Sequence, residues 1–333
     1  MPGRCVTRIE RRGQRDHCSL STPKLVENFF RHEYGRLVAI LSRQVGVQDI
    51  EAVEDAVQSA LMKALDTWTA AGLPENPSAW LFRVALNDLL GELRQRTSHR
   101  FILEQYASRA IDTPENGPEC LTPGEVVDNL LRMLFVCCDE TIPTESQTVF
   151  ALKVLCGFSI REIAFRLFTT DANVYKRLGR ARSRLRELPR DLGELTSEHY
   201  QSRLAAVNNI LYVLFTEGYL SCHAELAIRR ELCDEAIRLA TMLAEHPIGQ
   251  VPETFALLAL MHLHVARIAA RQDASGGLLL LEEQDRGLWD RQRIQVGLEW
   301  LARSARGDNL SRYHAEAGIA AEHCLAPSFE DTR

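Results

Sequence analysis

Apolar residues recur at helical spacing along almost the whole chain, and this periodicity limits the fold more than any other feature. From Lys24 to Val45, and again from about Asp49 to Trp68, apolar side chains collect on one face of each segment, three or four residues apart. No segment shows the sustained alternation of apolar and polar residues that is typical of a half-buried strand. The sequence therefore predicts an all-α protein.

Breaks rich in proline and glycine divide the chain into helical blocks. A break at 72–77 ends the second helix, and Ser78 is a candidate N-cap for a third helix that runs to about Arg96. At 333 residues the chain is long enough for two or three domains. The positions of these breaks predict a disordered arm at 1–23, helical domains at 24–106 and 125–190, a linker at 107–124 and a helical extension at 197–333.

The segment from Ser159 to Leu188 has the pattern of a helix-turn-helix. A short helix over 160–167 is followed by a turn, and Thr170 stands where the N-cap of the next helix belongs. The small Ala164 suits the point where two crossed helices approach each other. The second helix is strongly basic, and such a helix can place side chains on base edges and phosphates in the major groove. The candidate DNA-binding residues are Asn173, Lys176, Arg177, Arg180, Arg182 and Arg184.

This segment resembles the domain with which sigma factors read the promoter −35 element, and the extracytoplasmic-function (ECF) group of the sigma-70 superfamily is the closest match. The resemblance is carried by Glu162-Ile163-Ala164, Val174, Arg177-Leu178 and Arg180-Ala181. The chain departs from the pattern at Thr169, which is polar where a leucine-like residue usually closes the turn. The resemblance implies a sigma factor that directs core RNA polymerase to specific promoters, with the β′ clamp, the β flap and promoter DNA as partners.

Two upstream segments extend the resemblance. Residues 49–58 resemble region 2.2, which docks on the clamp coiled coil of β′, and the acceptors there are Glu51, Glu54, Asp55 and Gln58. Residues 78–87 resemble the part of regions 2.3–2.4 that captures the melted −10 element, where stacking and nearby cations stabilise unpaired bases. The DNA contacts predicted there are Arg83, Asn87, Arg94 and Arg96. Trp80 is expected mainly in the core, and Gly91 replaces an aspartate that is common in relatives.

The C-terminal third differs from the rest of the chain in charge. Residues 1–190 carry 26 basic and 24 acidic residues, whereas residues 191–333 carry 13 and 21. Residues 211–219 resemble the "FNEGY" segment of an ECF subgroup with a tetratricopeptide-like helical extension. In such sequences the extension normally runs further, so a last repeat is expected to be missing. Acidic, stacked helices suit protein interaction or intramolecular regulation, with an anti-sigma or other regulatory protein as a candidate partner.

Other classes of protein explain fewer of these features. A conventional helix-turn-helix regulator with a ligand- or protein-sensing C-terminal domain leaves residues 80–87 and the acidic helix unexplained. No H-E-x-x-H, G-x-S-x-G or Walker-type loop indicates an enzyme. The nine cysteines lack C-x-x-C spacing, and His262 and His264 would point to opposite sides of a helix. We therefore predict no catalytic residue, no metal and no cofactor.

The N-terminal sequence and the hydropathy of the chain bear on its location. The arginine-rich start has no apolar core of a secretory signal. No run approaches the roughly 18 apolar residues of a membrane span. The sequence therefore predicts a cytoplasmic protein without a membrane partner.

Overall fold

The computed structural model describes residues 22–96, 123–188, 195–220, 228–273, 275–307 and 309–332. These residues form helices and their connections, and a single antiparallel bridge between Gln272 and Leu278 is the only strand-like pairing among them. The predicted all-α class is confirmed. The predicted arm at 1–23 and linker at 107–124 lie almost wholly outside the described residues.

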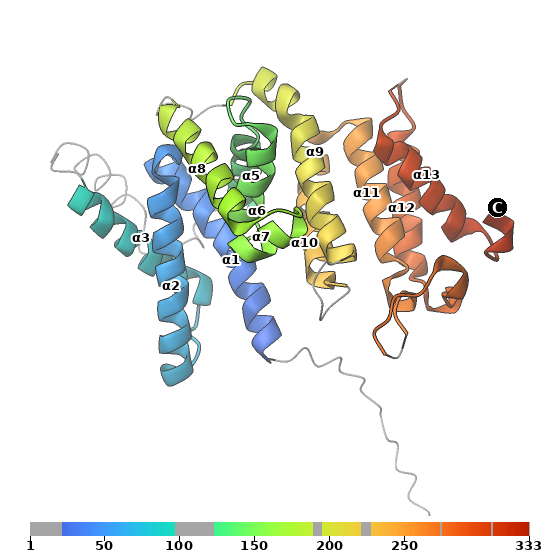
Figure 1. Cartoon of the computed structure of the whole chain (residues 1–333), viewed down its shortest axis with the longest axis horizontal. Coiled ribbons are helices and arrows are strands. Elements are labelled where there is room, and N and C mark those ends of the chain that lie inside the picture. The colour runs from blue at the N-terminus through green and yellow to red at the C-terminus, as the bar shows by residue number, and fades with distance from the viewer. Residues whose placement is uncertain are drawn as a thin grey trace, which may run out of the picture.

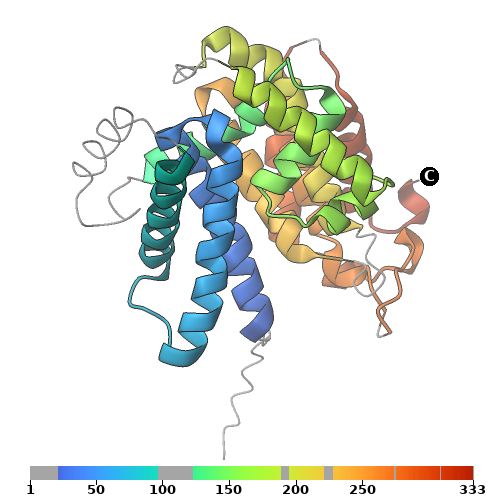
Figure 2. The ribbon, with the colours of Figure 1, turned by 60° about the vertical axis from the view of Figure 1, so that its left-hand side comes forward.

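The first helical unit contains α1 (Thr22–Val45), η1 (Val47–Asp49), α2 (Ile50–Ala71) and α3 (Pro77–Arg96). Helix α2 lies between α3 and α1 and packs against both (Figures 1 and 2). The rings of Trp68 and Trp80 meet edge to face, with centroids 5.5 Å apart. Trp80 packs against the core and is partly buried. The predicted cap Ser78 is wrong: Asn76 Oδ1 accepts from the Ala79 amide at 3.0 Å, and Pro77 occupies the first helical position.

The second unit contains α5 (Pro123–Cys137), α6 (Thr144–Val154), α7 (Ile160–Arg166) and α8 (Asp171–Glu187). Helix α1 packs along α5, so the two units share one continuous apolar core. At Gly35 of α1 the backbone lies against the end of α6, because an added Cβ there would lie 2.1 Å from the carbonyl oxygen of Leu155. Only a glycine allows this contact without a shift of one helix.

The extension is a row of stacked helices that follows the second unit (yellow to red in Figure 1). Helix α11 is central in the row, because α10, α12 and α13 all pack against it. The helices are α9 (Ser197–Tyr219), α10 (Arg230–Glu245), α11 (Pro252–Val265), α12 (Arg291–Ser304) and α13 (Arg312–Leu325). Short 3₁₀ turns join or follow them: η3 (Pro247–Gly249), η4 (Ile268–Ala270), η5 (Leu281–Glu283), η6 (Arg286–Leu288) and η7 (Glu330–Thr332).

One part of the extension is apolar enough to pass for a membrane span. Residues Pro252–Ala270 meet the length and hydropathy expected of such a span, which the prediction from the sequence did not anticipate. In the structure 78% of this window is buried inside the protein. Its hydropathy is therefore explained by its place at the centre of the helical stack.

Candidate polymerase and promoter interfaces

The helix-turn-helix is built by two capped helices. At the start of α7 the Glu162 amide donates to Ser159 Oγ at 3.2 Å, and the Ser159 amide donates to Glu162 Oε2 at 2.7 Å. The turn bends back at Phe168, whose φ of 49° lies in the left-handed region. As the sequence predicted, Thr170 caps α8, accepting from the Asn173 amide at 3.3 Å. These bonds fix where α8 begins and which way it points.

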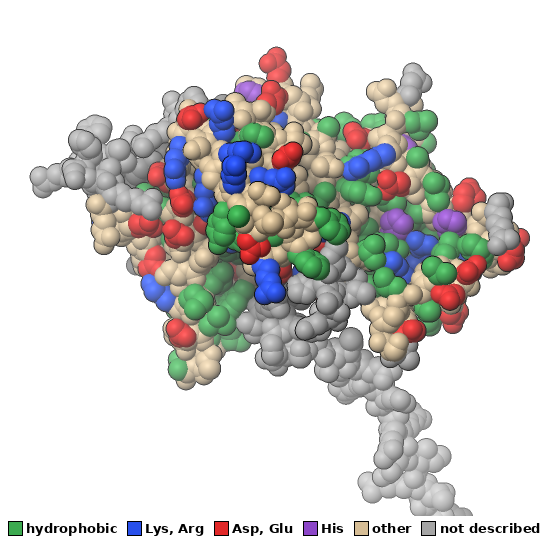
Figure 3. Space-filling model, viewed as in Figure 1, with side chains coloured by type: hydrophobic (Ala, Val, Ile, Leu, Met, Phe, Trp, Pro, Cys, Tyr) green, Lys and Arg blue, Asp and Glu red, His purple; other side chains and the backbone are tan. Residues whose placement is uncertain are grey.

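The side chains of α8 lie on three faces of the helix: a buried face, a basic face turned to solvent and a face that contacts α2. Its buried stripe packs against the rest of the second unit and consists of Val174, Leu178, Ala181 and Leu185. At 100° per residue, the predicted DNA contacts other than Arg182 fall together on a second face that does not overlap this stripe. Those five are Asn173, Lys176, Arg177, Arg180 and Arg184. Lys and Arg side chains gather over this part of the molecule in Figure 3.

Local contacts hold three of these five side chains, and one of them is the pair of Arg184 with Glu187 at 3.0 Å. The Asn173 side-chain amide donates to Thr169 Oγ1 at 3.2 Å, so the polar residue that departs from the family pattern orients a predicted base-reading group. Arg177 pairs with Glu145 at 3.2 Å. The face thus combines an oriented amide with a line of cations, which suits base-edge and phosphate contacts.

Arg182 takes a different direction from the other predicted DNA contacts. It pairs with two acids of α2, at 3.3 Å to Glu51 and 2.7 Å to Glu54. Arg186, one turn further on the same face of α8, also pairs with Glu51. The structure therefore brings a predicted promoter residue together with two predicted polymerase-docking residues.

Consequently only part of the acidic face of α2 is exposed to solvent. Glu54 is 1% exposed, because it accepts from the Tyr34 hydroxyl at 3.2 Å as well as from Arg182. Burial, followed by the charge of Glu54, raises the pKa of Tyr34 well above its usual value. Asp55 and Gln58 are exposed and are the members of the predicted docking set that α8 leaves uncovered.

The predicted −10 contacts lie on α3. Arg83, Asn87 and Arg94 are all exposed and fall within about 40° of one another around the helix. Arg96 ends the helix, and its side chain lies outside the described residues. Beside this stripe, Lys63 of α2 pairs with Asp88 at 2.7 Å and Ser59 donates to the same carboxylate at 2.8 Å. These bonds fix α3 against α2.

Ion pairs between the three parts of the chain were not predicted from the sequence. The pair between Arg203 of α9 and Asp139 is the most buried, with side chains 5% exposed and 2.5 Å apart. Glu162 accepts from Arg31 of α1 and from Arg229 next to α10, both at 3.4 Å. From the sequence alone, a charged residue in a loop or on a helix face is expected to be exposed to solvent. The spacing of apolar residues therefore does not indicate which charged residues form buried ion pairs.

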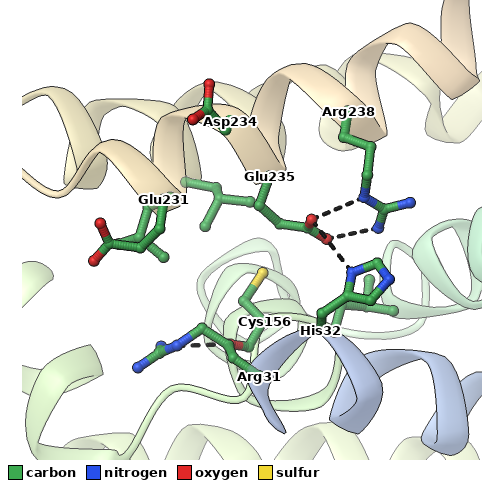
Figure 4. Close-up of a pocket in the computed structure, with 10 residues that line it drawn as sticks. Arg31, His32, Cys156, Glu231, Asp234, Glu235 and Arg238 are labelled. Atoms are coloured by element: carbon green, nitrogen blue, oxygen red, sulfur yellow. Dashed lines mark hydrogen bonds and ion pairs between the residues drawn. The ribbon is translucent and has the colours of Figure 1, made fainter. Parts of the chain in front are cut away.

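A cavity of about 340 Å³ lies where the three parts meet (Figure 4). Arg31 and His32 of α1 face Cys156 of the second unit and Glu235 and Arg238 of α10 across it. Burial raises the pKa of the Cys156 thiol to about 12, so this thiol is not activated for reaction. Among the described residues, no cluster of three His, Cys, Asp or Glu side chains could hold a metal ion.

The two helical units and the extension each match a known family. Residues 29–99 match sigma-70 region 2, and residues 132–185 match sigma-70 region 4. Residues 203–305 match a family of unknown function, DUF6596. The chain therefore belongs to the sigma-70 family, as an ECF-like sigma factor with a C-terminal extension. Such factors direct RNA polymerase to promoters.

Two relatives agree with this assignment. A protein of Rhizobium meliloti (strain 1021) described as uncharacterized protein R00370 is 32% identical over 86% of this chain and 67% of its own length. A protein of Haemophilus influenzae described as a probable RNA polymerase sigma factor is 24% identical over 43% of this chain and 79% of its own length. No solved structure matches the chain.

Proposed function

We propose that the two sigma regions divide promoter recognition among the exposed faces of three helices. Helix α8 contacts the −35 element through the five residues of its outward face: Asn173, Lys176, Arg177, Arg180 and Arg184. Helix α3 contacts the melted −10 element through the stripe of Arg83, Asn87 and Arg94, with Arg96 at its end. Helix α2 offers its acidic face to core polymerase, on which Asp55 and Gln58 are exposed and Glu51 and Glu54 pair with Arg182.

The observation that carries this proposal is the geometry of α8. A capped helix crosses behind a shorter helix, buries one stripe, and turns a separate basic face outward, within the stretch that matches sigma-70 region 4. This is how a recognition helix enters a major groove. The α3 stripe supports the −10 role in the same way, because cations beside an amide suit an unpaired strand.

Run-off transcription with purified core polymerase tests the proposal. The chain and core together should give a discrete transcript from a cognate promoter, and neither should do so alone. Arg180→Ala should lower promoter binding about tenfold, the effect expected for loss of one base or phosphate contact. Arg230→Ala serves as the control, because Arg230 is an exposed arginine of α10 in the extension.

The alternative is a conventional helix-turn-helix regulator, and the same experiment separates the two. Tight, sequence-specific DNA binding without any dependence on core polymerase would support the regulator and contradict the sigma-factor roles. Sigma factors act on RNA polymerase in the cytoplasm and are themselves non-catalytic. We infer that this chain likewise works there as a non-catalytic subunit without a cofactor, and a regulatory protein that binds the extension stays a prediction.

A further inference from the structure

We infer that the extension carries a binding site for a small aromatic carboxylate, in a cavity of about 180 Å³ between α7, α9 and α11. The cavity lies where α7 of the second unit meets the helices of the extension (Figure 1). Its lining includes Arg166 of α7, the rings of Tyr212, Phe215 and Tyr219 of α9, and His264 of α11. This site is separate from the promoter and polymerase faces and does not depend on the roles proposed for them.

The volume of the cavity limits the ligand to about one ring. A cavity of about 150 Å³ is enough to hold benzene. The space between α7, α9 and α11 therefore accommodates a six-membered ring with one small substituent, whereas drug-sized ligands occupy pockets of about 300 Å³ or more. Leu220, which also lines the cavity, is 50% exposed, so a ligand can enter from solvent on that side.

Three aromatic rings form one wall of the cavity. The rings of Phe215 and Tyr219 are stacked, with an angle of 15° between their planes and 5.7 Å between their centroids. The centroid of the His264 ring lies 4.7 Å from that of Tyr219. Phe215 and Tyr219 belong to residues 211–219, which resemble the "FNEGY" segment and have no part in promoter recognition. Aromatic rings favour other rings in stacked or edge-to-face contact, so this wall suits a planar aromatic ligand.

Arginines outnumber carboxylates around this wall. Arg267 donates to the Tyr219 hydroxyl at 3.2 Å, and Cζ of Arg271 lies 3.8 Å from the centroid of the Tyr219 ring. Arg166 pairs with Glu217 at 3.2 Å. Within the part of the chain that the structure describes, the other two arginines pair with no carboxylate. The surroundings of the cavity therefore carry an excess of positive charge, which favours an anion where water is largely excluded.

Tyr212, the remaining ring of the lining, does not alter this balance of charge. Its hydroxyl donates to Glu316 at 3.1 Å, and Cζ of Arg312 lies 4.4 Å from the centroid of its ring, so it brings one charge of each sign. Boxes of aromatic rings also bind quaternary ammonium groups. The excess of arginine disfavours a cation here, and the ligand is therefore an aromatic anion.

His264 supplies a hydrogen-bond donor for the carboxylate. Arg267 donates to His264 Nδ1 at 3.0 Å, so the neutral ring carries its proton on Nε2. Burial, followed by the charges of Arg267 and Arg271, lowers the pKa of His264 to about 3, which keeps the ring neutral at pH 7. Among the described residues nothing accepts from this Nε2–H group, and its nitrogen is accessible to solvent. A carboxylate oxygen in the cavity can therefore accept from it.

Arg166 connects the site to the helix-turn-helix. It is the last residue of α7, and its guanidinium donates to Thr216 Oγ1 and pairs with Glu217, both in α9. The lining of the cavity thus comes from both the second unit and the extension. A ligand that binds only when these parts are in contact stabilises the contact, so an occupied site should hold α7 against α9 more firmly than an empty one.

Isothermal titration calorimetry of the full-length chain with benzoate tests the site. Benzoate should bind saturably, with one molecule per chain. Benzamide has the same ring without the charge, and acetate has the charge without the ring. Each should bind at least about tenfold more weakly than benzoate, the loss expected when one charge-assisted bond or the ring contacts are removed. Equal affinities for benzamide and benzoate would overturn the anionic class of ligand, and no binding of benzoate to the folded chain would overturn the site.

A pair of variants locates the bound benzoate. His264→Phe keeps an aromatic ring in the wall but removes the Nε2–H donor, and it should weaken benzoate binding at least about tenfold. His262→Phe is the matched control, because His262 lies two residues earlier in α11 and does not line the cavity. It should bind benzoate as the wild type does. Equal benzoate affinities of the two variants would place the ligand elsewhere and overturn the site.

Photolabelling of the wild type covers the case in which His264→Phe does not fold. After irradiation with 4-azidobenzoate, mass spectrometry should find the label on α9 or α11, and excess benzoate should prevent it. A label found only elsewhere, for example on the basic face of α8, would overturn the site. These measurements use neither polymerase nor DNA, so their failure leaves the proposed promoter recognition unaffected.

Discussion

At the scale of single residues, the side chains that act together are often far apart in the sequence. Glu54 reads as one more acid on an exposed amphipathic helix, yet it is buried under Arg182, which lies 128 positions further along the chain. Helical spacing places Glu54 beside the buried Ile50 and Val57, whereas Asp55 points away from them and is exposed. The prediction of one acidic face did not use this difference, and no local pattern identifies Arg182 as the partner.

Asp55 provides the residue-scale prediction. Asp55→Arg places a positive charge on the uncovered part of the docking face and should weaken binding to core polymerase at least about tenfold, since like charges meet an arginine-bearing partner. Asp66→Arg is the control: it is exposed on nearly the same face of α2, about 16 Å further along the axis. Binding is measured by fluorescence anisotropy with core in the absence of DNA. Equal affinities of the two variants would show that the docking face is misplaced.

At the scale of helices, the sequence was most informative where local bonds decide the outcome. The cap of α8 at Thr170 and the end of α1 at Val45 follow from short-range signals and agree with the structure. The start of α3 does not, because two residues near one another, Asn76 and Ser78, both suit an N-cap. Proline favours the first position of a helix, so Pro77 begins α3 and the residue before it, Asn76, is the N-cap.

The cap of α8 gives a prediction for this element. Thr170→Ala removes the oxygen that accepts from the Asn173 amide and should destabilise the first turn of α8 by about 1 kcal/mol. Amides in that turn should then exchange with deuterium about fivefold faster. Ser183→Ala, at an exposed position within the same helix, should leave exchange there unchanged. A similar rate for Thr170→Ala and wild type would show that the threonine does not hold the helix end.

At the scale of the whole molecule, the order of the parts was predictable and their contacts were not. Breaks in periodicity separated two sigma units from an acidic extension, because proline and glycine interrupt helices wherever they fall. The packing of α1 on α5 and the junction at Glu162 depend on which helix faces meet. Many pairings would bury similar apolar faces, and only details such as Gly35 select one.

The centre of the extension makes the whole molecule sensitive to acid. Burial lowers the pKa of His262 to about 4 and that of His264 to about 3, and Arg267 donates to His264 Nδ1 at 3.0 Å, which requires that nitrogen to be unprotonated. Both imidazoles are therefore neutral in the folded protein over a range in which an unfolded chain, with pKa values near 6.5, takes up protons. The unfolded state binds more protons in that window, so stability falls as the pH drops from about 6.5 towards 4.

Each buried imidazole makes the unfolding free energy fall by up to about 1.4 kcal/mol for each unit that the pH drops in that window. His264→Gln removes one proton site from the folded and unfolded states alike, so its unfolding free energy should depend less steeply on pH, whatever its stability at pH 7.5. Urea unfolding followed by circular dichroism between pH 7.5 and 4.5 measures both slopes. Parallel profiles for the variant and the wild type would mean that His264 is protonated equally in both states. Because α11 contacts α9, α10, α12 and α13, a loss of stability there should loosen the whole extension at low pH.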